Sequence, residues 1–158
     1  MNICMSWFRL VVCAMFVSIA GTVFGQIPAS NKNSEVQVMH FDAAKVNASF
    51  EKGSPLFPGT EDGHYQILTA RREKAGQSEV HAKFTDVIYV VEGTATFVTG
   101  GEVVDGKTTA PDEIRGEGIK GGTSRKLAKG DVIVVPNNMP HQFTEVNAPF
   151  LYLVVKVK

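Results

Sequence analysis

Residues 79–93, which read EVHAKFTDVIYVVEG, decide the fold and indicate where its chemistry lies. In a strand, side chains at i and i+2 share a face, so Glu79 and His81 are expected to point the same way. A tight turn within residues 82–85 would place Asp86 on the returning strand opposite His81, where cross-strand Cβ atoms lie about 4.5–5.5 Å apart. These three side chains could therefore converge on one metal ion from a single hairpin.

A second stretch, residues 130–143 (GDVIVVPNNMPHQF), brings a further imidazole. Its apolar run, residues 132–135, predicts a buried strand that ends at Pro136. The Asn-Asn pair that follows favours a turn, and Pro140 restricts the backbone where it enters His141. We expect this rigid corner to hold the imidazole in one direction, as a fourth ligand of the same metal ion.

Outward from these two stretches, the pattern is one of short strands. They are rich in Val, Ile, Tyr, Phe and Thr, and Gly or Pro occupies most of the gaps. The expected strands are residues 65–71, 79–83, 87–91, 95–98, 132–135, 142–146 and 151–157. Because no second long amphipathic pattern lies between them, the sequence favours an antiparallel sandwich or a closed barrel over parallel βαβ units.

Two other parts of the chain complete the expected architecture. Asp42 before residues 43–52 and Gly53 after them predict one short N-terminal helix with a cap at each end. Residues 100–130 are polar and rich in Gly, and they are either a long functional loop or an irregular extra hairpin. The expected fold class is all-β with one short helix.

The first residues carry the pattern of an export signal. Arg9 precedes the apolar run 10–24, and Gly25 offers a small residue for cleavage before Gln26. That run of about 15 residues is shorter than the roughly 20 that a membrane span needs. We therefore expect a periplasmic or secreted protein. Its expected segments are a signal peptide over residues 1–25, a flexible leader over 26–34 and a single domain over 35–158.

Removal of the signal would leave no cysteine, because Cys4 and Cys13 are the two in the sequence. A disulfide, a thiol nucleophile and a Cys-based metal site are therefore excluded from the mature chain. The charge is balanced at 16 basic and 16 acidic residues, and no basic run offers a footprint for nucleic acid. We expect a small molecule as the partner, with no nucleic acid and, after signal removal, no membrane.

The two stretches closely resemble the two motifs of the cupin family. The first motif of that family runs Gly, His-x-His, four residues, Glu, six residues, Gly, and the matching positions here are Gly76, Glu79, His81, Asp86 and Gly93. The second runs Gly, five residues, Pro-x-Gly, two residues, His, three residues, Asn, and the matching positions are Gly130, Pro136, Asn137-Asn138, His141 and Glu145. The resemblance covers the chain from about residue 65 to its end.

Several identities depart from the family pattern, among them those at residues 79, 86 and 145. Glu79 replaces the first His and Asp86 replaces the Glu, and both remain able to bind a metal. Glu145 stands where the family often has Asn, which we interpret as a packing or turn position. The alternative readings are that Glu79 is an exposed strand residue and that Asp86 only caps the turn.

The resemblance implies a double-stranded β-helix, or jelly-roll barrel, with one metal ion at its centre and often a homodimer. It also implies that residues beside the ligands line a pocket. The candidates for this lining are Ile88, Val90, Phe143, Tyr152 and Arg71. Arg71 could reach a substrate carboxylate, or it could belong to a solvated turn.

The four expected ligands suit a divalent first-row ion, namely Fe, Mn, Ni or Zn. Two His and one carboxylate with open positions is the ligand set of non-haem iron oxygenases, so we expect a metal-dependent, dioxygenase-type oxidoreductase that acts on a small organic molecule. Glu79 is the expected catalytic residue, since Glu79 or Asp86 could detach and move protons. A non-catalytic protein that binds a small ligand or a metal is the alternative. A sugar isomerase or epimerase is a third, although the sequence shows no convincing Lys-His or Tyr-His pair.

Overall fold

The computed structural model describes residues 38–60 and 63–158, so the predicted signal peptide and flexible leader lie outside the described residues. The elements are α1 (Ala43–Lys52), β1 (Pro55–Phe57), β2 (Tyr65–Arg72), β3 (Ser78–His81), β4 (Thr85–Thr99), β5 (Glu102–Val104), β6 (Lys107–Ala110), β7 (Glu113–Gly116), β8 (Gly118–Lys120), β9 (Thr123–Ala128), β10 (Val132–Val135) and β11 (His141–Val157). Within this part of the chain, no helix is both long and apolar enough to cross a membrane. The predicted fold class, all-β with one short helix, is confirmed.

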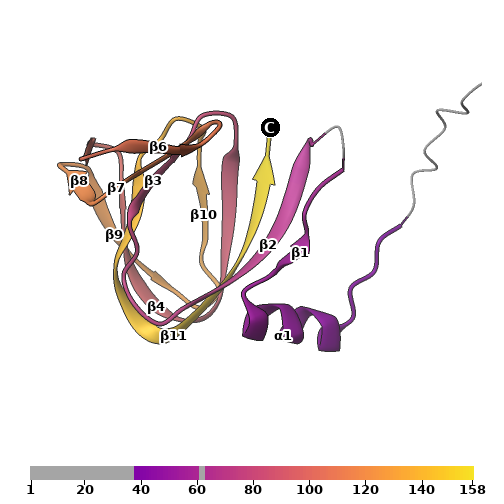
Figure 1. Cartoon of the computed structure of the whole chain (residues 1–158). Coiled ribbons are helices and arrows are strands. Elements are labelled where there is room, and N and C mark those ends of the chain that lie inside the picture. The colour runs from indigo at the N-terminus through magenta and orange to yellow at the C-terminus, as the bar shows by residue number, and fades with distance from the viewer. Residues whose placement is uncertain (1–37, 61–62) are drawn as a thin grey trace, which may run out of the picture. The chain divides into compact units, whose positions relative to one another are not determined.

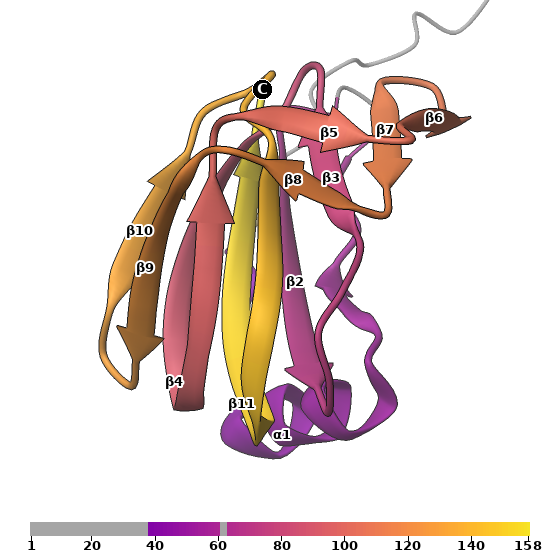
Figure 2. The ribbon, with the colours of Figure 1, turned by 90° about the vertical axis from the view of Figure 1, so that its left-hand side faces the viewer.

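Nine of these strands form one antiparallel sheet that curls round an interior (Figure 1 and Figure 2). The two longest strands, β4 and β11, pair with each other over most of their length. On its other side β11 pairs with β2 and β3, and β4 pairs with β9 and β10. Each long strand therefore lines the interior twice, once before and once after a bend.

The two long strands correct the predicted strand boundaries. The sequence suggests separate strands at residues 87–91 and 95–98, but β4 runs without a break through Gly93, and β11 runs through Pro149. Gly93 has a positive φ of 81°, and a Cβ there would lie 2.6 Å from the carbonyl oxygen of Pro149. Only glycine allows so close an approach. The residue that looks like a strand end in the sequence therefore marks a bend.

The short helix begins and ends at the predicted residues. The side chain of Asp42 accepts a hydrogen bond from the backbone N–H of Lys45 at 2.8 Å, and Gly53 ends the helix in the left-handed conformation with φ 60°. Ser49, which is buried, accepts a hydrogen bond from the hydroxyl of Thr69 on β2 at 3.0 Å. This bond fixes α1 against the sheet.

Residues 100–130 follow the hairpin alternative rather than the loop. They contain β5 to β9, of which β5 and β8 form a separate two-stranded sheet (Figure 2). β7 pairs with β3, and this register sets Glu113 opposite His81. The segment therefore adds a strand beside the residues that the sequence marked as a metal site.

The apolar side chains of the interior form what we call the aromatic core. Four aromatic rings, those of Phe97, Phe143, Phe150 and Tyr152, lie with neighbouring centroids 4.4–5.3 Å apart. The remaining members are Ile88, Val90, Ala95, Leu127, Val135 and Val154. Such tilted ring pairs add packing energy to the burial of apolar area.

Candidate metal centre

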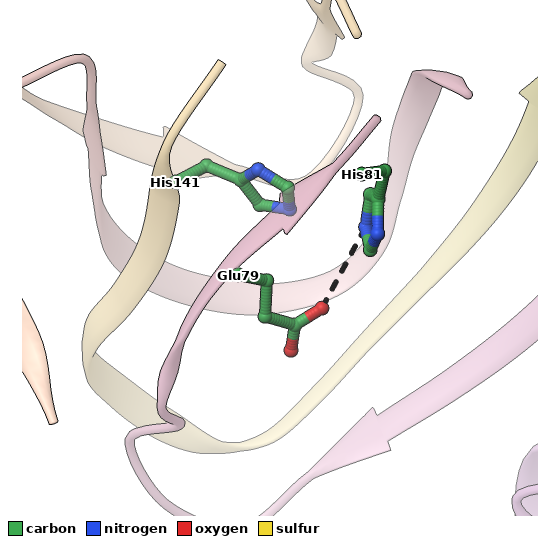
Figure 3. A group of neighbouring side chains, drawn as sticks. All are labelled: Glu79, His81 and His141. Carbon is green, nitrogen blue, oxygen red and sulfur yellow. Dashed lines mark ion pairs between the residues drawn. The ribbon is translucent and has the colours of Figure 1, made fainter. Parts of the chain in front are cut away.

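The interior beyond the aromatic core holds a cluster of two imidazoles and a carboxylate. Glu79 and His81 project from β3, and His141, the first residue of β11, pairs in register with Glu79. One ligand atom from each of these three residues lies within 4.8 Å of the others (Figure 3). The Oε2 atom of Glu79 is 3.7 Å from Nε2 of His81. The structure thus brings together three of the four predicted ligands in a group that could hold a metal ion.

A turn before β11 fixes the direction of His141. Its Nδ1 lies 3.0 Å from the carbonyl oxygen of Met139, which leaves Nε2 for the interior. Asn138, in the left-handed conformation with φ 61°, donates its backbone N–H to the carbonyl oxygen of His81 at 2.8 Å. The corner after Pro136 therefore ties the second motif to the first.

Glu113 on β7 fixes the direction of the His81 imidazole. Its part in the site was not predicted from the sequence. Its Oε2 lies 2.5 Å from Nδ1 of His81. Nε2 of His81 is buried and has no hydrogen-bond partner among the described residues. A metal-bound imidazole typically binds a carboxylate or carbonyl through its second nitrogen in this way, so Nε2 of His81 fits a metal ligand. In the sequence, residues 113–115 (EIR) give only a weak strand pattern, which does not reveal the pairing with β3.

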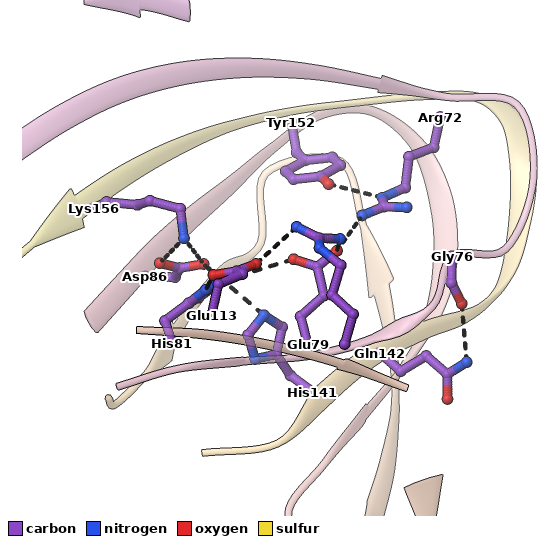
Figure 4. Close-up of polar contacts among 11 residues, drawn as sticks. Arg72, Gly76, Glu79, His81, Asp86, Glu113, His141, Gln142, Tyr152 and Lys156 are labelled. Carbon is purple, nitrogen blue, oxygen red and sulfur yellow. Dashed lines mark hydrogen bonds and ion pairs between the residues drawn. The ribbon is translucent and has the colours of Figure 1, made fainter. Parts of the chain in front are cut away.

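Two arginines hold the carboxylate of Glu79. Its Oε1 atom accepts a hydrogen bond from Nη1 of Arg115 at 2.8 Å and lies 3.5 Å from Nη2 of Arg72. Arg115 also donates to Glu113 at 2.8 Å. Figure 4 shows Arg72, Glu79 and Glu113 in this cluster of polar contacts. Because Oε1 faces the guanidinium groups, Oε2 is left on the side of His81 and is available to a metal ion.

Asp86, the fourth predicted ligand, lies beside the cluster and binds Lys156. Its two oxygens accept from Nζ of Lys156 at 2.8 and 3.0 Å. Its Oδ2 is also 3.3 Å from Nε2 of His81 and 4.0 Å from Nε2 of His141. Burial raises the pKa of Asp86, but His81 and Lys156 outweigh it and hold that pKa below its ordinary value. Asp86 is therefore a carboxylate shared between a lysine and the two imidazoles.

Comparison of the sequence with protein families identifies the family of this chain. Residues 53–157 match the family model described as Cupin. The chain is a cupin. Curated protein sequences include none that matches it.

Several solved structures are similar to this cupin. One is a conserved protein with a double-stranded β-helix domain from Klebsiella pneumoniae (16% identity, 77% of this chain and 90% of that chain, TM-score 0.50). A hydroquinone 1,2-dioxygenase from Sphingomonas sp. TTNP3 is similar at 17% identity, 78% and 81% coverage and TM-score 0.49. A Streptomyces protein solved with uridine has 14% identity and TM-score 0.44, and this chain spans 63% of its length. At these identities the likeness shows the fold alone.

The two imidazoles of the cupin differ in their electrostatic surroundings. Burial lowers the pKa of each. At His81 the carboxylates of Asp86 and Glu113 outweigh burial and raise the pKa above its ordinary value. At His141 burial prevails, and the pKa is lowered. Since a metal binds the neutral imidazole, His141 is ready to ligate, whereas His81 must first release any proton that it holds.

The cluster opens into a cavity of about 390 Å³. Of the residues expected to line it, Ile88, Phe143 and Tyr152 do so. Val90 shares the face of Ile88 but lies further along β4, fully buried in the aromatic core. Burial raises the pKa of Tyr152, so its phenol is neutral at physiological pH.

Arg71 does not reach the cavity, and its neighbour Arg72 does. Side chains alternate along β2, so consecutive arginines point to opposite faces of the sheet. Arg71 is on the outer face and pairs with the exposed Glu73 at 2.7 Å. Arg72 faces inward with Leu68 and Ala70, which also line the cavity. Arg71 therefore belongs to a solvated turn, as the alternative reading expected, and the arginine that lines the cavity is Arg72, one position further on.

Proposed function

We propose that this cupin binds one divalent first-row metal ion, Fe, Mn, Ni or Zn, through Glu79, His81 and His141. We further propose that it is a metal-dependent, dioxygenase-type enzyme acting on a small organic molecule. The observation that carries this proposal is the meeting of the three ligand atoms at a buried point. There, among the described residues, Nε2 of His81 makes no well-aligned hydrogen bond and has carboxylate oxygens of Asp86 and Glu79 as neighbours at 3.3 and 3.7 Å. A bound ion would give that nitrogen a well-directed partner in the interior.

Two imidazoles and one carboxylate leave coordination positions open for substrate or O₂. A bound ion would supply Lewis-acid chemistry or the activation of O₂. Glu79 is also the proposed proton acceptor. Its Oε1 is held by Arg115, so Oε2 could detach from a bound ion and accept a proton while the side chain stays in place. Asp86 could serve as a fourth ligand only if one of its carboxylate oxygens were released from Lys156.

Metal analysis of the purified protein tests the site. We expect about one ion per chain in the wild type and loss of that ion in His81→Ala and His141→Ala. His64→Ala is the matched control, because His64 is exposed and lies outside the cavity. Equal metal content in the wild type and in a double mutant of His81 and His141 would refute the site.

Turnover is tested separately, by O₂ consumption of the iron- or manganese-loaded protein across a panel of small organic molecules. In Glu79→Gln we expect the rate to fall by well over tenfold, since a positioned general base contributes about 10²–10⁴. A protein that binds a ligand stoichiometrically but transforms nothing would favour the non-catalytic binding function instead.

One observation favours the isomerase or epimerase alternative. The sequence offered no acid–base pair for that chemistry, but Lys156 lines the cavity and its Nζ binds Asp86. An amine and a carboxylate beside a metal could pass a proton between two carbons of a sugar. Sugar isomerisation that is abolished in Lys156→Met, with metal content unchanged, would replace the dioxygenase proposal.

Export of the protein and its assembly as a homodimer are also proposals. The first rests on the signal pattern of residues 1–25, and the second on the resemblance to the cupin family.

A further inference from the structure

Three cations line the cavity, and two of them are already neutralised. Nζ of Lys156 binds both oxygens of Asp86. Arg115 donates to Glu79 and to Glu113, each at 2.8 Å. Both cations therefore have strong carboxylate partners at short range.

The third cation, Arg72, has a longer and weaker carboxylate contact than the other two. Its Nε donates to the hydroxyl of Tyr152 at 2.8 Å, and this hydroxyl is neutral. Among the described residues its carboxylate contact is the one from Nη2 to Oε1 of Glu79, at 3.5 Å. The side chain is 23% exposed, so the charge is largely withdrawn from water without being fully paired. A half-buried guanidinium of this kind favours an anion.

The surroundings hold the guanidinium of Arg72 in place. It lies over the ring of Phe143 at 4.9 Å and near that of Tyr152 at 5.8 Å. Gly76 faces it without a side chain, and a Cβ built there would collide with Nη1 of Arg72. The backbone of Gly76 is itself fixed by hydrogen bonds with Phe143 and Gln142. Arg72 is therefore pre-positioned and loses little freedom on binding.

The charge of the cavity also favours an anionic guest. Its lining contains three carboxylates, those of Glu79, Asp86 and Glu113, and the three cations. A divalent ion at the proposed metal site would add two positive charges to this balanced set. The rest of the lining includes the apolar side chains of Leu68, Ile88, Phe143 and Val154.

We propose that Arg72 binds the carboxylate of the substrate, a small organic acid whose apolar body packs against these walls. The inference rests on the proposed function, since it names the class of substrate for the same cavity. A guanidinium binds a carboxylate through two parallel N–H donors. Nη2 of Arg72 lies beside the proposed metal site, 3.5 Å from Oε1 of Glu79. The apolar walls favour such an acid over inorganic phosphate.

Calorimetric titration of the zinc-loaded protein with benzoate tests this inference. Benzamide, the uncharged analogue of benzoate, is the control ligand. We expect the wild type to bind benzoate at least about tenfold more tightly than benzamide or inorganic phosphate. Arg72→Gln should weaken benzoate binding by at least about tenfold. Gly76→Ala keeps the charge but shifts the end of the Arg72 side chain, so it should weaken benzoate binding to a smaller extent than Arg72→Gln. Arg71→Gln removes the adjacent, outward-facing charge and should bind benzoate as the wild type does.

Metal content, measured in parallel, separates this inference from the proposed function. Both Arg72→Gln and Gly76→Ala should retain zinc, because neither removes a proposed ligand. If the protein binds no metal yet binds benzoate in an Arg72-dependent way, the proposed function fails and the carboxylate site stands. The inference is overturned if benzamide or phosphate binds as tightly as benzoate. Benzoate affinity unchanged in both variants overturns it as well.

Discussion

Along β11 the same strand serves two very different regions. Its middle residues, Phe150 and Tyr152, belong to the aromatic core, where apolar side chains are buried against one another. His141 at its start and Lys156 near its end belong to the polar cluster, where almost every charge contacts an opposite charge. The core is held by apolar burial and packing, and the cluster by the pairing of buried charges. A substitution in each region should therefore be read out differently.

The largest effect is expected from the aromatic core. Phe97 has no exposed surface, and its ring lies 4.4 Å from that of Phe143 and 5.9 Å from that of His141. Phe97→Ala should lower the free energy of unfolding by about 3–5 kcal/mol, because it leaves a cavity. Urea unfolding of the metal-free protein measures this. Tyr89→Ala, at a residue 46% exposed on the outer face, is the control and should cost far less. A loss below about 1 kcal/mol for Phe97→Ala would show that the core can collapse around the gap.

A smaller effect on folding is expected from Asp86. Asp86→Asn removes charged hydrogen bonds to Lys156, worth about 1.5–3 kcal/mol at neutral pH. The folded-state pKa of Asp86 lies below its unfolded value of about 3.9. Its contribution is therefore full above that value and is lost as the pH falls through the folded pKa.

Unfolding of the wild type and of Asp86→Asn, compared between pH 7 and pH 3 in metal-free protein, measures this loss. The difference in stability between the two proteins should shrink toward the acid end. A difference that stays constant with pH would mean that the charge of Asp86 does not stabilise the fold.

The smallest effect is expected at Glu113, and it should appear in metal affinity rather than in stability. Glu113→Gln can still hydrogen-bond Nδ1 of His81, but it lacks the charge that makes the imidazole a stronger ligand. We expect zinc affinity, measured by competition with a chelator, to fall roughly tenfold. Glu117→Gln removes an exposed carboxylate nearby and should leave the affinity unchanged. Equal zinc affinities in Glu113→Gln and Glu117→Gln would show that the charge of Glu113 does not strengthen His81 as a ligand.

The sequence predicted local geometry well and cross-strand register poorly. Alternation along a strand was enough to place Glu79 and His81 on one face, because that depends on two residues of spacing. The same rule could not tell which of Arg71 and Arg72 faces the interior, because both faces of β2 carry apolar residues. Glu113 and Lys156 reach the cluster through pairings of β3 with β7 and of β4 with β11. Such registers are set by the packing of the whole sheet, and the residue pattern of a single strand does not predict them.

The pairing of β4 with β11 also determines when the proposed metal site can form. His141 pairs with Thr99, and Lys156 pairs with Asp86, 70 positions earlier in the chain. Contacts between such distant segments form late and make folding slow, because a long loop must be closed before any of them is gained. A nascent or unfolded chain would therefore offer isolated, weakly binding side chains. Tight capture of an ion would begin only when the last strand has docked, so that metal loading reports the completion of folding.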